Sequence, residues 1–91
     1  MSNTTTNRVV ITHGLGLHLR AAGALVQVAS KFTSDISIQS GGHIANAKSI
    51  MSVLSLGAVV GTELEVTSTG DDAAEALEAV CKIIEADFNL S

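Results

Sequence analysis

The residues with the clearest chemical potential are His18 and Arg20, which follow Gly16 at the start of a predicted helix. The first backbone N–H groups of a helix lack intrahelical partners and carry partial positive charge, so they bind anions. Imidazole is a good nucleophile near neutral pH, since its ordinary pKa of about 6.5 leaves a neutral nitrogen available. A guanidinium offers a planar fork of donors to phosphoryl oxygens. The spacing therefore indicates a histidine that accepts a phosphoryl group.

A second interpretation of these residues stays open at this point. A histidine at a loop–helix junction is often a polar cap, and an arginine in a first turn is often only solvated, so the short pattern permits both readings. His13 and His43 do not combine with His18 into a metal-ligand spacing, and no Asp or Glu lies near them in the sequence. We expect no metal site and no cofactor.

A second segment, the predicted short helix 50–56, carries more apolar residues than one buried side can use. If Ile50 and Val53 face the core, Met51 and Leu54 lie near the surface. Exposed apolar groups often mark a docking surface, and methionine adapts to several partners. An equally good explanation is that Met51 and Leu54 fill the core, because only 2% of the residues of this domain are aromatic.

These segments lie within an alternation of strand and helix patterns. Residues 1–7 are polar and are expected to be frayed. Asp72 and Glu75 are spaced as a capping box, which explains these acids without acid–base chemistry. The strands are expected at 8–12, at 34–39 and 43–47, which Gly41-Gly42 joins as a hairpin, and at 63–69. A short helix is expected at 50–56, beginning after Ser49 and ending before Gly57. Two longer helices are expected from their apolar faces, the first with Ala22, Leu25, Val26, Ala29 and Thr33, and the last with Ala74, Leu77, Cys81, Ile84 and Phe88.

This order predicts an α+β fold, an open-faced sandwich. A four-stranded, mainly antiparallel sheet is covered on one face by three helices in the order βαββαβα, and its other face meets water. Ninety-one residues correspond to one domain, 1–91. The strand order does not follow from the patterns.

Composition restricts the class of protein. The formal net charge is −4, which argues against a nucleic-acid partner. Eight of the nine acidic residues follow residue 60 and four of the five basic residues precede residue 49, so one face can still be positive. Cys81 is the single cysteine and is expected to be buried, which suits a reducing compartment. No apolar run approaches the about 18 residues of a membrane span, so a cytoplasmic protein is expected.

Two motifs together carry a resemblance that covers residues 8–88. Residues 16–22 read Gly-Leu-His-Leu-Arg-Ala-Ala, similar to the active-site pattern Gly-Leu/Ile-His-x-Arg-Pro-Ala of the HPr family of the bacterial phosphoenolpyruvate-dependent phosphotransferase system. Residues 48–51 read Lys-Ser-Ile-Met, followed by Ser-Leu-Gly at 55–57, and resemble the pattern around the family's regulatory serine. The chain is thereby identified as a member of the HPr family.

The resemblance implies specific roles. His18 would accept a phosphoryl group on Nδ1 from phosphorylated enzyme I and pass it to an enzyme II A domain, with Arg20 interacting with the phosphoryl group. Ser49 would be modified by HPr kinase/phosphorylase in bacteria that have that enzyme. Such a protein is a phosphoryl-transfer intermediate rather than a stand-alone enzyme, and a monomer that associates transiently is expected. The residues expected to contact partners are Leu17, Leu19, Lys48, Ile50, Met51 and Leu54.

Three substitutions depart from the family pattern. Ala21 replaces the usual proline, which predicts a slightly more mobile loop; Leu19 replaces a small residue, which adds apolar surface; and Ser52 replaces a common glycine. None removes a reacting group. Two other functions remain alternatives. One is a regulatory interaction module of the same fold, on a nitrogen-type branch or with a kinase or transcription factor as partner, and the other is a small hydrolase resembling an acylphosphatase.

Overall fold

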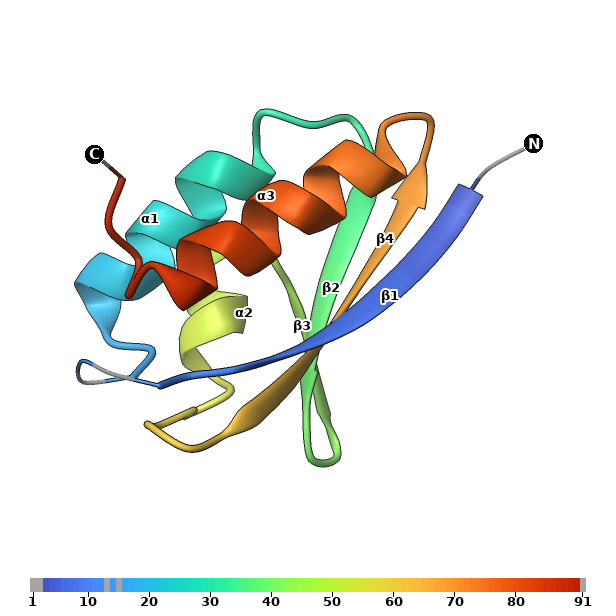
Figure 1. The fold of residues 1–91 in the computed structure, drawn as a ribbon. Coiled ribbons are helices and arrows are strands. Elements are labelled where there is room, and N and C mark those ends of the chain that lie inside the picture. The colour runs from blue at the N-terminus through green and yellow to red at the C-terminus, as the bar shows by residue number, and fades with distance from the viewer. Residues whose placement is uncertain (1–2, 13, 15, 91) are drawn as a thin grey trace.

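The computed structural model describes residues 3–12, 14 and 16–90, which form seven elements (Figure 1). These elements are β1 (Asn3–Val10), α1 (Leu19–Ala29), β2 (Asp35–Ser40), β3 (His43–Asn46), α2 (Ile50–Leu54), β4 (Glu63–Gly70) and α3 (Ala73–Glu85). The order confirms the predicted βαββαβα arrangement.

The four strands form one sheet in the order β1-β4-β2-β3, and all three neighbouring pairs are antiparallel. Helix α3 packs on β1, β4 and β2, while α1 packs between α3 and α2. Figure 1 shows the three helices together on one face of the sheet. The predicted open-faced α+β sandwich is confirmed, and the order of strands within the sheet is added by the structure.

The expectation of a frayed N-terminus is wrong for residues 3–7. These residues belong to β1, whose whole length pairs with β4 from Asn3↔Gly70 to Val10↔Glu63. The hydroxyl groups of Thr4 and Thr69 lie 3.1 Å apart. Threonine favours strands because its branched side chain fits a pleated surface, and here its hydroxyl also finds a cross-strand partner. Residues 1–2 lie outside the described residues.

The core between sheet and helices is built from aliphatic side chains and alanines. Alanines at 21, 22 and 29 are fully buried, which lets α1 lie close to its neighbours. Phe88 is 1% exposed and follows α3 in a turn with φ 60°, where its N–H donates to the Ile83 carbonyl at 2.8 Å. The largest of the other fully buried side chains are Ile11, Leu25, Ile38, Leu64, Ile84, Val53, Val66 and Val80.

The capping box predicted at the start of α3 does not form. Asp72 is the N-cap residue, but its side chain makes no capping bond. Its carboxylate instead accepts hydrogen bonds from the N–H groups of Thr33 and Ser34, each at 2.9 Å, and from the Ser34 hydroxyl at 2.5 Å. These bonds, the hydroxyl's foremost, lower the pKa of Asp72 from 3.8 to about 2. Asp72 therefore ties the loop after α1 to the start of α3.

The start and end of α2 follow the sequence pattern closely. Ser49 is the N-cap, and its hydroxyl oxygen accepts a hydrogen bond from the Ser52 N–H at 3.3 Å. The helix ends at Leu54, two residues before the predicted end, and Gly57 follows with a left-handed φ of 59°.

Cys81 is a buried free thiol, as expected, and burial raises its pKa, with a smaller contribution from Glu85. Such a thiol is unreactive, because the nucleophilic form is the thiolate. No helix in the described ranges is both long enough and apolar enough to span a membrane.

Candidate functional site

The backbone before His18 is held in place by the segment that follows α2. The Leu17 N–H donates to the Ala58 carbonyl at 3.0 Å. Gly16 has a φ of +79°, and a Cβ built on it would lie 2.5 Å from the Ala58 oxygen and 2.8 Å from the Val59 Cα. Any side chain at position 16 would collide with that backbone, so the glycine is required for the contact as well as for the turn.

His18 is the N-cap residue of α1. Its backbone is extended, with φ −92° and ψ −179°, its carbonyl accepts from the Ala22 N–H at 2.9 Å, and its side chain makes no capping bond. The N–H groups of the first helical turn are therefore left without a side-chain cap, in contrast to those of α2. The imidazole is partly buried at the surface and remains open to an approaching group. The polar-cap reading of His18 is thus not supported.

Arg20 lies in the first turn of α1 and is exposed. In the part of the chain that the structure describes, its guanidinium makes no ion pair; Arg8, by contrast, pairs with Glu65 at 3.3 Å. An unpaired guanidinium beside uncapped amides gives the start of α1 a positive local field. His18, the amides and Arg20 together form a site that can hold a phosphoryl group.

Leu17 and Leu19, both expected to contact partners, differ sharply in burial. Leu17 is 6% exposed and belongs to the core, so its assignment to a partner surface is wrong. Leu19 is 67% exposed. The two residues also differ in backbone setting: the Leu17 N–H bonds to Ala58 in the loop before α1, whereas Leu19 is the first residue of α1.

The predicted docking helix, α2, packs beside α1. Met51 is 75% exposed, while Leu54 is partly buried and packs against the core. Val53 faces the core as predicted, but Ile50 does not, because it is 39% exposed. Apolar surface at Leu19, Ile50 and Met51 is thus presented by two neighbouring helices.

The two residues before α2 make internal bonds. The Lys48 ammonium donates to the Phe32 carbonyl at 2.7 Å, so it joins α2 to the loop after α1 and is less available to a partner than predicted. Ser49 is partly buried; its N–H donates to the Asn46 carbonyl at 3.0 Å. The Ser52 hydroxyl accepts from the Asn46 N–H at 2.8 Å, so this departure from the family pattern supplies a bond of its own.

Sequence reasoning missed two exposed residues next to this site. Val59 and Val60 are 60% and 48% exposed in the segment between α2 and β4. The signal was available: two consecutive β-branched residues stand before Gly61, outside any alternating strand pattern. A buried strand would need more such residues, and a hairpin loop would be polar.

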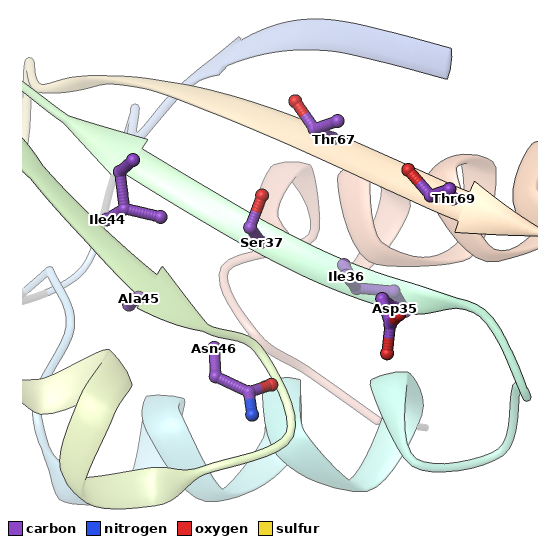
Figure 2. Close-up of a pocket in the computed structure, with 8 residues that line it drawn as sticks. All are labelled: Asp35, Ile36, Ser37, Ile44, Ala45, Asn46, Thr67 and Thr69. Atoms are coloured by element: carbon purple, nitrogen blue, oxygen red, sulfur yellow. The ribbon is translucent and has the colours of Figure 1, made fainter. Parts of the chain in front are cut away.

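A groove of about 350 Å³ crosses the open face of the sheet, away from the helices (Figure 2). Threonine side chains of β4, Ser37 of β2 and Asn46 of β3 lie along it. Asp35 is the single charged residue among those that line it, and His18 is not one of them. The groove therefore takes no part in the chemistry of His18.

The remaining histidines and acids provide no second centre. Across residues 3–12, 14 and 16–90, no three His, Cys, Asp or Glu side chains lie close enough together to hold a metal ion. His43 is exposed at the start of β3, as predicted, and His13 lies outside the described residues. The chemistry of the described site thus rests on His18 and Arg20.

Comparison with known proteins connects this geometry to a family. A family model described as "PTS HPr component phosphorylation site" matches residues 5–86. The phosphocarrier protein HPr of Xylella fastidiosa strain 9a5c is 41% identical over 83 residues, which cover 91% of this chain and 93% of that protein.

Solved structures agree. HPr from Thermoanaerobacter tengcongensis superposes with a TM-score of 0.88 at 39% identity, covering 92% of this chain and 94% of that one. A structure described as an HPr dimer from the same organism gives a TM-score of 0.75 at 41% identity, covering 89% and 93%. The residues that the family model matches, 5–86, reach from β1 to the end of α3 and include His18. The chain therefore belongs to the HPr family and is a phosphocarrier protein of the phosphotransferase system.

Proposed function

We propose that His18 carries the phosphoryl group, which it accepts from phosphorylated enzyme I and donates to an enzyme II A domain. The observation that carries this proposal is the position of His18 as the N-cap of α1 without a side-chain capping bond. The imidazole nitrogen attacks phosphorus while the P–N or P–O bond to the donor breaks. In the second transfer, a nucleophile of the enzyme II A domain attacks the phosphorus while the P–N bond to His18 breaks, which regenerates the free imidazole. No small substrate is turned over.

Arg20 and the first-turn amides stabilise the phosphoryl oxygens in this proposal. Negative charge on those oxygens is favoured near a helix N-terminus and an unpaired guanidinium. Incubation with phosphoenolpyruvate and enzyme I tests the proposal. An acid-labile phosphate that is absent in His18→Ala supports it, whereas an unlabelled wild-type protein beside a labelled HPr standard contradicts it. The unlabelled result would favour a regulatory module of the same fold.

The partner surface proposed here consists of Leu19, Ile50 and Met51, hereafter the docking patch. All three are exposed: Leu19 directly follows His18 at the start of α1, and Ile50 and Met51 lie on α2, which packs against α1. An apolar patch beside an open nucleophile suits brief association, because its burial supplies affinity without charge pairs that must be desolvated. Leu54 supports the patch from the core side, and Leu17 has no part in it.

We further propose that phosphorylation of Ser49 by HPr kinase/phosphorylase weakens partner binding. Ser49 directly precedes the docking patch residue Ile50, and a phosphate there would add about −1.5 to −2 charges to an apolar contact. Ser49→Asp is expected to accept phosphate from enzyme I more slowly than wild type. Ser55→Asp, at an exposed position after α2, serves as the matched control. Equal rates for the two variants and the wild type would contradict this role.

The whole chain is proposed to act as one domain, as a monomer, in the cytoplasm. Transient exchange between two partners requires His18 to be free in turn for each. The dimer described for a relative makes the oligomeric state worth measuring, and sedimentation at working concentration is the direct test. The buried thiol of Cys81 fits a reducing compartment.

A further inference from the structure

A groove of about 260 Å³, hereafter the α1–α3 groove, lies where the end of α1 meets the second half of α3. All of its lining residues come from these two helices and from the segments that follow them. Figure 1 shows the two helices side by side, with the chain after α3 turning back beside α1. Val28 and Ile83 give the groove apolar surface from the two helices, and both pack in or against the core.

Leu90 adds apolar surface from a third direction, and its position depends on how the chain leaves α3. Asp87 and Phe88 follow the helix with φ values of 56° and 60°, left-handed conformations that turn the chain back. Phe88 is buried and anchors this turn in the core. Leu90 lines the groove although it is 51% exposed, so its side chain contributes to the groove and not to the core.

The charged residues that line the groove are both cationic. Lys31 and Lys82 are exposed, and neither ammonium forms an ion pair with any residue whose position the structure describes. Glu78, one turn before Lys82 on α3, lines an adjoining hollow and not the groove. On a chain with a formal net charge of −4, this groove therefore presents positive charge around apolar surface, which complements carboxylates on an apolar partner.

The groove is separated from His18 by most of the length of α1. Val28 follows His18 by ten residues, which corresponds to about 15 Å along a helix axis, and Lys31 lies almost one turn further on. The docking patch residues do not line the groove. A segment that fills the groove therefore leaves the imidazole free to meet a phosphoryl donor.

We propose that the α1–α3 groove docks an acidic, amphipathic helix of another protein. The apolar side chains of that helix cover Val28, Ile83 and Leu90, and its carboxylates pair with Lys31 and Lys82. Two helices that pack side by side leave a furrow that accepts the apolar ridge of a third helix. Apolar burial supplies most of the affinity, whereas the exposed ion pairs, which are weak, select acidic over basic helices. The contact does not involve His18, so the same partner binds the free and the phosphorylated protein.

Binding of a synthetic helix to the full chain tests this proposal. The probe is a peptide of about 14 residues, roughly four helical turns, with leucines at i, i+3, i+4 and i+7 and glutamates on both flanks. A second peptide carries lysines in place of the glutamates. The backbone amide shifts of the isotope-labelled protein are expected to change saturably around Val28, Ile83 and Leu90, and the acidic peptide is expected to bind about tenfold more tightly than the basic one.

Substitutions separate the two parts of the contact. Lys31→Gln combined with Lys82→Gln is expected to remove the preference for the acidic peptide, and Arg8→Gln, which removes a charge from the sheet, is expected to keep it. Leu90→Ser is expected to weaken both peptides roughly tenfold. Ile44→Ser is the matched control on the open face of the sheet and is expected to bind as wild type (Figure 2). All five side chains are exposed, so unfolding midpoints close to that of the wild type are expected.

Several results would overturn the proposal. These are equal affinities of the two peptides for the wild-type chain, the absence of any saturable shift, and shifts centred on the docking patch. Binding that is unchanged both by Leu90→Ser and by the double lysine substitution would have the same consequence. Protein phosphorylated by phosphoenolpyruvate and enzyme I is expected to bind the acidic peptide within about twofold of the unphosphorylated affinity. Loss of binding on phosphorylation would contradict the separation of the groove from His18.

Discussion

The Leu17 N–H donates to the Ala58 carbonyl oxygen at 3.0 Å and so joins the backbone next to His18, the proposed phosphoryl acceptor, to a residue 41 positions further along the chain. This bond matters for the proposed function, because it holds the backbone from which the His18 side chain extends. The reactive turn is thus held by tertiary structure, and the helix that follows it supplies the amides.

Arg20 is expected to matter for transfer and not for stability. Arg20→Ala removes an unpaired guanidinium, so the unfolding free energy should stay within about 0.5 kcal/mol of wild type. The rate of phosphoryl transfer should fall about 10–100-fold, because the developing charge on the phosphoryl oxygens loses its donor. Arg20→Lys should recover part of the rate, since it keeps the charge without the planar fork.

Rapid-quench measurement of phosphoryl transfer from phosphorylated enzyme I gives these rates. Arg8→Ala is the control for the loss of a positive charge elsewhere on the surface. A transfer rate for Arg20→Ala equal to that for Arg8→Ala would remove Arg20 from the site.

Leu17 and Leu19 are expected to give opposite phenotypes. Leu17→Ala opens a cavity in the core and should cost about 2–4 kcal/mol of unfolding free energy. Leu19→Ser should leave that free energy nearly unchanged and raise KM for enzyme I. Urea unfolding and steady-state phosphorylation measure the two effects. Equal destabilisation by both substitutions would contradict the burial of Leu17 and the exposure of Leu19.

Asp72 is expected to make folding stability depend on pH in the acid range. Its pKa is about 2 in the folded chain against 3.8 ordinarily. A group with a depressed folded-state pKa contributes stability above the unfolded pKa, so this contribution is complete above about pH 5 and is lost as the pH falls through 3.8 toward 2. Asp72→Asn should lower the midpoint of urea unfolding at pH 7 and flatten its pH dependence below pH 4.

Asp71→Asn, which changes the exposed neighbouring acid, provides the comparison for Asp72→Asn. The same slope below pH 4 in both variants would show that the bonds from Thr33 and Ser34 do not hold the carboxylate in solution.

Ala21→Pro, which restores the usual residue of the family, should be tolerated. Ala21 is the third residue of α1. The first intrahelical bond runs from the Ala22 N–H to the His18 carbonyl, so the Ala21 N–H comes too early in the helix to make one. A proline there breaks no backbone bond and restricts the unfolded chain, so a gain of about 0.5 kcal/mol in unfolding free energy is expected. Thermal unfolding measures it; a loss above 1 kcal/mol would indicate that the ring does not fit at this fully buried position.

The alternation of patterns predicted the order of elements correctly, because apolar periodicity is a local property that packing then reinforces. The glycine at Gly57 and the N-cap at Ser49 were predictable for the same reason. The strand from Asn3 was missed because its residues are polar, and a polar edge strand differs from a frayed end only through its partner β4. Sequence patterns do not contain that partner.

At the site, residue types and spacing indicated a phosphoryl acceptor but left a polar cap as an alternative, and tertiary contacts decided which residues are exposed. The roles of His18 and Arg20 follow from the family pattern and stay a prediction. Leu17 lies in the loop before α1, where a bond to Ala58 holds its backbone, and no sequence periodicity predicts the burial of a residue in such a loop. Asp is a typical helix N-cap residue, yet the Asp72 carboxylate accepts its hydrogen bonds from the loop at Ser34 instead. Val59 lies against Gly16 only because the chain returns past that glycine after α2.

The most direct measurement is the location of the phosphate after reaction with phosphoenolpyruvate and enzyme I. Cleavage after Arg8 and Arg20 gives a peptide, residues 9–20, that contains both His13 and His18. Fragmentation of this peptide under neutral conditions is expected to place the phosphate on His18, with full labelling of His13→Ala and none of His18→Ala. Phosphate on His13, or labelling that survives His18→Ala, would contradict the account.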